Sequence, residues 1–124
     1  MLQLKQYVKV ANLDEAYELN QKKNSVIVGG MHWLKMSSTA YGTAIDLSGL
    51  GLDQIVETDE AFEIGCMVSL RQLETHEGLN TYTAGAVREA VKDIVGVQFR
   101  NTATVGGSIW GRYGFSDVLT VFLA

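Results

Sequence analysis

The chain of 124 residues contains no proline and only one cysteine, Cys66. A single cysteine excludes an internal disulfide and any metal site built on a cysteine cluster. The neighbours of Cys66 are apolar, which favours an inert, buried thiol. The two histidines, His32 and His76, are not spaced as metal ligands, so we predict no metal site. Because proline is absent, the turns depend on the 13 glycines.

The sequence also lacks a block of basic charge and a long apolar run. The formal net charge is −4, so nucleic acid is not an expected partner. No apolar stretch approaches the roughly 18 residues of a membrane span. Residues 1–20 lack the apolar segment of a signal peptide. We therefore expect a cytoplasmic protein with no membrane partner.

Short strands and helices follow one another along the chain, which predicts an α+β fold in two small lobes, residues 1–54 and 55–124. Two capping boxes mark helix starts, one at Asn12 with Glu15 and one at Ser69 with Gln72. The expected helices cover residues 12–22, 69–76 (stopped by Gly78), 80–95 and 117–123, with one helical turn over 32–36. The expected strands cover residues 2–10, 25–28 and 44–47, and a hairpin covers 54–66.

Two glycine pairs are the main candidates for a ligand site. Gly29-Gly30 follows an apolar strand, and Gly106-Gly107 follows residues 103–105 in the same form. Glycine allows positive φ and close approach of another group, and successive free N–H groups in a turn bind anions. A glycine-rich loop that enters a helix adds the helix dipole. A single glycine pair after a strand is more often a tight turn, but because the chain has two such pairs we predict that both turns face one extended diphosphate. Neither pair matches the Rossmann or Walker pattern.

Polar and aromatic side chains near these turns leave two interpretations open. Ser116-Asp117 either caps the last helix or binds ligand hydroxyls, and both can hold at once. Asp46, at a strand end, either satisfies loop amides or faces water. Three aromatic residues either cover a flat ring or simply pack: Trp33, Trp110 and Tyr113. Arg100 and Arg112 either meet phosphate or are solvated.

No combination of nucleophile, base and acid is present, and no catalytic residue is predicted. Glu74, His76 and Glu77 read as a solvated face at a helix end. If the chain belongs to an enzyme, the chemistry must therefore come from a cofactor.

Three segments together resemble one family. They are residues 26–30, residues 45–74, and residues 99–109 with Ser116-Asp117. This pattern is similar to the FAD-binding (medium) subunit of molybdenum hydroxylases, the family of xanthine dehydrogenase and carbon monoxide dehydrogenase. The resemblance implies an α+β FAD-binding fold of the vanillyl-alcohol oxidase type, in which FAD lies extended between two lobes. The cofactor-binding residues that it implies are Val28, Gly29, Gly30, Met31, His32, Trp33, Thr104, Gly106, Gly107, Ser108, Gly111, Ser116 and Asp117.

The resemblance also implies a role and partners. A molybdopterin subunit would pass electrons through an iron–sulfur subunit to this FAD, and then to NAD or another acceptor. The chain would thus be a subunit of an FAD-dependent oxidoreductase. It departs from the family at the bulky residues 31–33, at Ser108 where Asn is usual, and at Gly114-Phe115 where proline is usual.

Family subunits are more than twice as long, so we expect an N-terminal part that ends within the second lobe. The apolar segment Val118, Leu119, Val121, Phe122 and Leu123 would then be bare. On this basis the isolated chain would be inactive, hold FAD weakly and form a homodimer. The alternative is a non-catalytic fragment that does not hold FAD and acts only as a folded, self-associating module.

Overall fold

The computed structural model describes residues 1–124, which separate into two compact units, residues 1–52 and 53–124. The boundary predicted from the sequence falls slightly later. Both helices and strands are present, so the predicted α+β class is confirmed. The expected proximity of the two glycine pairs stays a prediction.

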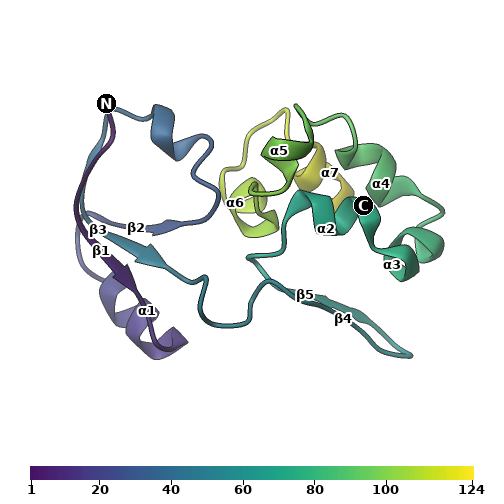
Figure 1. The fold of residues 1–124 in the computed structure, drawn as a ribbon, viewed down its shortest axis with the longest axis horizontal. Helices are drawn as coiled ribbons and strands as arrows, with labels where there is room; N and C mark the ends of the chain where they lie inside the picture. Colours follow the sequence, from purple (N-terminus) through teal and green to yellow (C-terminus); the bar gives the residue numbers. More distant parts are fainter. The chain divides into compact units, whose positions relative to one another are not determined.

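The first unit is built on a three-stranded parallel sheet. Strand β3 (Ala40–Asp46) lies between β1 (Gln3–Lys9) and β2 (Ser25–Val28) (Figure 1). Both outer strands run parallel to β3, with Lys9 and Val28 in register with Asp46. The carboxyl ends of all three strands therefore meet at one edge. In open parallel sheets this edge is where ligands bind.

Burial is concentrated at the end of the central strand. Ala44 and Ile45 are fully buried, and Asp46 and Leu47 are nearly so. A continuous buried run is typical of a central parallel strand. Helix α1 (Leu13–Asn20) packs nearby, where the Ser25 hydroxyl donates to the Leu19 carbonyl at 2.8 Å. Its start is confirmed, because the Asn12 side chain accepts from the Glu15 amide.

The second unit places a short antiparallel hairpin against a group of helices. The hairpin pairs β4 (Ile55–Glu57) with β5 (Phe62–Ile64). Its apolar side chains pack on a core formed by Val68, Leu70, Leu73, Leu79, Val87, Val91, Ala103, Val105 and Val118. The helices are α2 (Leu70–Thr75), α3 (Glu77–Tyr82), α4 (Ala86–Val91), α5 (Val97–Arg100), α6 (Val105–Trp110) and α7 (Asp117–Leu123) (Figure 1).

The helix predicted over residues 69–76 matches α2, but its predicted stop signal is wrong, and so is the single helix predicted over residues 80–95. Gly78 does not stop a helix but lies inside α3. The break falls at His76, whose backbone is extended and whose Nδ1 accepts from the Leu79 amide at 3.0 Å, so that it caps α3. The single helix predicted over residues 80–95 is two helices, because Ala84 and Gly85 adopt left-handed φ values of 50° and 81°. A left-handed residue ends a helix.

The apolar segment at the end of the chain is partly covered. Val118 is 1 % exposed and Val121 packs against the core, whereas Phe122 and Leu123 are 41 % and 79 % exposed. The expectation of a bare segment is therefore wrong for Val118. Self-association stays a prediction. It depends mainly on the exposed side chains of Phe122 and Leu123 and not on the whole segment. None of the helices has the length and apolar character needed to cross a membrane.

Candidate cofactor site

The first glycine pair forms a bend directly after β2. The 3-10 helix η1 (Leu34–Met36) begins four residues later. Within the bend, the N–H groups of Gly29, Gly30 and Met31 donate no hydrogen bond to the chain. Three successive unbonded amides at the carboxyl end of a parallel strand form a site suited to an anion.

The backbone of this turn differs from the prediction in one respect. The left-handed residue is Met31, with a φ of 60°, and neither Gly29 nor Gly30 has a positive φ. The glycines therefore matter because they lack side chains, and Met31 carries the strained conformation. Such residues concentrate at functional sites. Val28 is buried, Met31 and His32 are half-buried, and Trp33 is 49 % exposed.

Asp46 fixes the end of the neighbouring strand. Its carboxylate accepts hydrogen bonds from the Ser48 amide at 2.8 Å, from the Ser48 hydroxyl at 2.9 Å and from the Tyr7 hydroxyl. Burial alone raises the pKa of Asp46, but the Tyr7 and Ser48 hydrogen bonds outweigh it and hold this pKa below its usual value. Asp46 thus satisfies a loop amide, one of its two predicted roles. Sequence analysis missed Tyr7, which no local pattern connects to Asp46.

The second glycine pair does not repeat the form of the first. Gly106 and Gly107 lie inside the first turn of α6, so the predicted strand and turn are wrong here. The amides of this turn are already bonded within the unit. Gly106 N–H donates to the Cys66 carbonyl at 2.8 Å, and Gly107 N–H donates to Thr104 Oγ1 at 3.2 Å. Thr104 therefore acts as the N-cap of α6.

A close backbone crossing explains this difference. Residues 103–106 run antiparallel beside residues 66–70, with a bridge between Ser69 and Thr104. A Cβ on Gly106 would lie 2.7 Å from the Cys66 carbonyl oxygen and 2.8 Å from the Cys66 Cβ. Only glycine fits such an approach. The Cys66 residue is exposed, so the prediction of a buried thiol is wrong.

The other predicted residues of this unit also have partners of their own. Ser116 caps α7 by accepting from the Leu119 amide at 3.2 Å, and its hydroxyl donates to the Ser108 carbonyl at 3.3 Å. The capping interpretation is confirmed, and Asp117 is an exposed first residue of α7. A Cβ on Gly111 would lie 2.8 Å from the Tyr113 ring. That ring stacks on Phe115 at 5.2 Å, and Trp110 is 80 % exposed.

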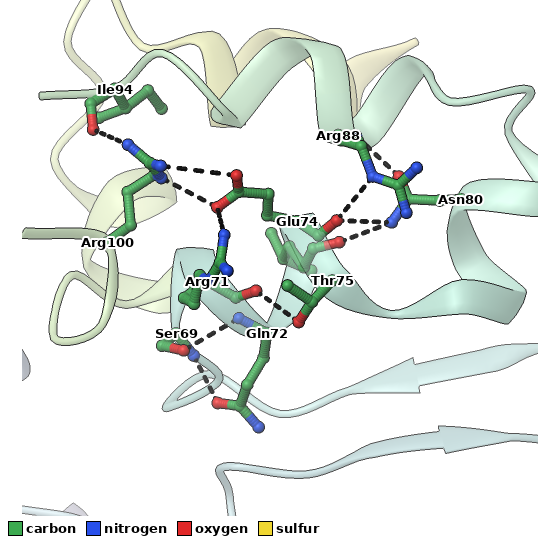
Figure 2. Close-up of polar contacts among 10 residues, drawn as sticks. Ser69, Arg71, Gln72, Glu74, Thr75, Asn80, Arg88, Ile94 and Arg100 are labelled. Atoms are coloured by element: carbon green, nitrogen blue, oxygen red, sulfur yellow. Dashed lines mark hydrogen bonds and ion pairs between the residues drawn. The ribbon is translucent and has the colours of Figure 1, made fainter. Parts of the chain in front are cut away.

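Arg100 belongs to the interior rather than to a phosphate site. Its Nε lies 3.0 Å from Glu74 Oε2, and its Nη1 donates to the Ile94 carbonyl at 3.0 Å (Figure 2). The side chains of Arg100 and Glu74 are only 7 % and 12 % exposed. The interpretation of Arg100 as a phosphate contact is therefore wrong, and so is the solvated face predicted at Glu74. Arg71 adds a second, more exposed partner at 2.9 Å.

Acid should weaken the second unit through Glu74. Burial raises the pKa of Glu74, but the hydrogen bonds from Arg71 and Arg100 outweigh burial and lower it from 4.5. Because the folded-state pKa is lowered, the stabilisation is complete above the unfolded-state value and is lost as pH falls through the folded-state value. We expect the urea concentration at the unfolding midpoint to decrease as the pH is lowered below 4.5. This decrease should be smaller in the Glu74→Gln variant.

The matched control for this pH dependence is Glu89→Gln. Glu89 pairs with Lys92 at the surface and its side chain is 65 % exposed. This variant should keep the acid dependence of the unchanged protein. Equal acid dependence in Glu74→Gln and Glu89→Gln would contradict the role given to Glu74.

Comparison with known proteins identifies the family. The family described as the FAD binding domain in molybdopterin dehydrogenase matches residues 2–124. The chain belongs to this family, whose cofactor is FAD. The uncharacterized protein YgfM of Escherichia coli (strain K12) is 29 % identical over 125 residues, which cover 98 % of this chain and 47 % of that protein. The chain thus spans about half the length of the curated relatives it matches.

Solved structures share the fold. A Cu,Mo-CO dehydrogenase has a TM-score of 0.75 at 19 % identity, over 90 % of this chain and 41 % of its own. Quinoline 2-oxidoreductase from Pseudomonas putida 86 has a TM-score of 0.72 at 17 % identity, with coverages of 88 % and 39 %. A carbon monoxide dehydrogenase from Hydrogenophaga pseudoflava has a TM-score of 0.68 at 24 % identity, with coverages of 87 % and 39 %. The FAD-binding fold expected from the sequence is therefore confirmed.

Proposed function

We propose that the chain is the FAD-binding part of the flavin subunit of a molybdopterin-dependent dehydrogenase, and that the turn over residues 28–33 binds the diphosphate of FAD. The observation that carries this proposal is the row of unbonded amides at Gly29, Gly30 and Met31. A diphosphate needs several N–H donors, and this turn offers three in succession.

The surroundings of the turn support the same assignment. Gly29 is exposed and has no side chain to hold a ligand away from the backbone. Met31 and Trp33 are bulkier than the residues usual in the family, but a side chain does not remove its own amide. Both side chains are uncharged, so the negative charge of the diphosphate would be met by backbone dipoles.

Three residues of the second unit would contribute side chains to the site: Asp117, Ser108 and Ser116. Asp117 is exposed and its carboxylate can accept hydrogen bonds from ribityl or ribose hydroxyls. The hydroxyls of Ser108 and Ser116 can also bond ligand hydroxyls, although in this structure they donate to the carbonyls of Thr104 and Ser108. We also propose contacts at Thr104, Gly107 and Gly111 of this unit and at His32 of the first unit. We do not propose that Gly106 donates to the cofactor, because its amide is bonded to Cys66.

Bound FAD would supply a redox chemistry that no side chain of the chain can supply. The residues of the chain would hold the cofactor and exclude competing reactions. In this proposal the chain relays electrons from an iron–sulfur subunit to an acceptor such as NAD, and a molybdopterin subunit completes the complex. The family and the fold shared with carbon monoxide dehydrogenases support this assignment.

A valine at position 29 should weaken the binding of FAD. The β-branched side chain would stand over the unbonded amides and hold the diphosphate away. We expect at least a tenfold rise in the dissociation constant, about 1.4 kcal/mol. Titration of each protein with FAD, followed by quenching of flavin fluorescence, measures the effect. Riboflavin, which lacks both phosphates, should bind weakly to both proteins.

Gly42→Ala is the matched control in the same unit. Gly42 lies in β3, and a Cβ there would lie 3.6 Å from the Asn24 carbonyl oxygen, an ordinary contact. This variant should bind FAD as the unchanged chain does. Thermal unfolding of both variants separates a loss of binding from a loss of fold. A folded Gly29→Val protein with unchanged FAD affinity would contradict the proposed site.

A further inference from the structure

His76 joins two helices of the second unit. It ends α2 and begins α3, and its own backbone is extended, with φ −69° and ψ 112°. Its carbonyl accepts from the Asn80 side chain at 2.8 Å and from the Asn80 amide at 3.2 Å. The residue is half-buried, and its ring meets the Phe62 ring edge-on, with the ring centres 6.0 Å apart. The imidazole is therefore held at the junction of α2, α3 and β5.

The hydrogen bond made by the ring requires a neutral imidazole. The Nδ1 atom accepts from the Leu79 amide at 3.0 Å, and a nitrogen that accepts carries no proton. This geometry assigns the ring proton to Nε2. An imidazolium has an N–H at both nitrogens and cannot accept. The Leu79 amide belongs to the first turn of α3, where amides have no acceptor within the helix. It therefore loses its partner when His76 takes up a proton.

Two carboxylates lie near this junction without replacing the cap. Glu77 is the exposed first residue of α3. Glu57 comes from β4 and reaches the same turn, since a Cβ on Gly78 would lie 2.6 Å from the Glu57 Cδ. Both charges attract an imidazolium, but exposed charges interact weakly and salt screens them. Their attraction does not supply the acceptor that the Leu79 amide loses.

The charged side chains of the neighbouring helices have other partners. The Arg88 Nε of α4 donates to the Glu74 carbonyl of α2 at 3.0 Å. The Glu74 carboxylate pairs with Arg100 at 3.0 Å. On the side of β5 the histidine faces the uncharged Phe62 ring, and the Tyr82 ring lies 5.8 Å from that ring. These groups take no part in the cap.

We infer that His76 is a proton-dependent cap, which closes the junction of α2 and α3 when it is neutral and opens it when it is protonated. The unfolded chain has no such hydrogen bond, so it takes up this proton more readily than the folded chain does. The stability of the second unit therefore rises with pH across the histidine range, about pH 5 to 8. This range lies above pH 4.5, below which Glu74 acts. The inference does not depend on the binding of FAD.

NMR of the unchanged chain at about pH 7.5 and about pH 5.5, within the histidine range, tests the cap directly. At the higher pH we expect a proton on Nε2 and none on Nδ1. At the lower pH the hydrogen-exchange protection of the Leu79 amide should fall at least threefold. The Gln72 amide is the internal reference, because the Ser69 hydroxyl that caps it at 3.1 Å does not titrate. A protonated Nδ1 at the higher pH, or unchanged protection at Leu79, would overturn the inference.

Two substitutions of His76 separate the cap from its titration. His76→Asn offers a side-chain oxygen that caps without titrating, so its urea midpoint should depend less on pH than that of the unchanged chain. His76→Ala lacks the cap at both pH values, and at the higher one its ratio of folded to unfolded protein should be about fivefold lower than in the unchanged chain. Salt at about 0.5 M screens Glu57 and Glu77 in these measurements.

His32→Asn is the matched control. His32 is the other histidine of the chain and lies in the first unit. This variant should keep the pH dependence of the Leu79 amide. A midpoint that depends equally on pH in His76→Asn and in the unchanged chain would overturn the inference. If the His76 variants do not fold, the Leu79 amide of the unchanged chain still decides it.

Discussion

Replacement of Arg100 by alanine should destabilise the second unit by about 3–5 kcal/mol, because it leaves a largely buried carboxylate with only the more exposed Arg71 as a partner. The Arg100 side chain is 7 % exposed, and it bonds both the Glu74 carboxylate and the Ile94 carbonyl (Figure 2). Removal of one member of a buried ion pair lowers the free energy of unfolding by more than the pair contributes, because the other charge stays buried. Urea unfolding monitored by circular dichroism gives the loss directly.

Arg71→Ala is a matched control that acts on the same carboxylate. Arg71 lies 2.9 Å from Glu74 Oε2, but its side chain is 40 % exposed. An exposed ion pair contributes about 0–1 kcal/mol, so this variant should be nearly as stable as the unchanged protein. Similar losses in Arg71→Ala and Arg100→Ala would show that burial does not separate the two arginines and would contradict the interpretation.

Replacement of Asn80 by alanine should have the second largest effect, a loss of about 2–4 kcal/mol. Asn80 is 4 % exposed and connects three helices. Its Nδ2 donates to the carbonyls of Leu73 and His76 at 2.9 Å and 2.8 Å. Its Oδ1 accepts from the Arg88 amide at 2.8 Å (Figure 2). Alanine would leave the ends of α2 and α4 with unpaired, poorly hydrated groups.

The neighbouring Thr81→Ala is the control for this substitution. Thr81 lies in α3 and is exposed, so its loss should change stability by no more than about 0.5 kcal/mol. Denaturant midpoints of the two variants, measured side by side, give the comparison. An Asn80→Ala protein as stable as Thr81→Ala would mean that water replaces the lost hydrogen bonds.

Features that depend on near neighbours in sequence were predictable. The helix starts at Asn12 and Ser69 follow from side chains that bond an amide three residues on. Ser69 and Gln72 form the complete capping box that their spacing indicates. The strand before Gly29 was likewise evident, because β-branched residues precede a turn signal. The family resemblance depended on these same local segments and was confirmed.

Features that depend on distant partners were not predictable. Arg100 and Glu74 are 26 positions apart, and Tyr7 and Asp46 are 39 positions apart. Nothing in the sequence indicates that these side chains meet. The glycine pair at 106–107 looked like the pair at 29–30, and only the crossing with residues 66–70 distinguishes them. The apolar periodicity over residues 80–95 also continues across the left-handed break at Ala84, which hides the end of α3.

We propose that the amides after β2 bind the diphosphate of FAD. Proton–nitrogen correlation NMR of the chain during titration with FAD tests it residue by residue. We expect the amide signals of Gly29, Gly30 and Met31 to shift most and to saturate, and the Gly106 signal to shift little because its N–H stays bonded to Cys66. Riboflavin should leave the signals of Gly29 and Gly30 in place. Saturable shifts that omit residues 29–31, or no saturable shift at all, would contradict the account.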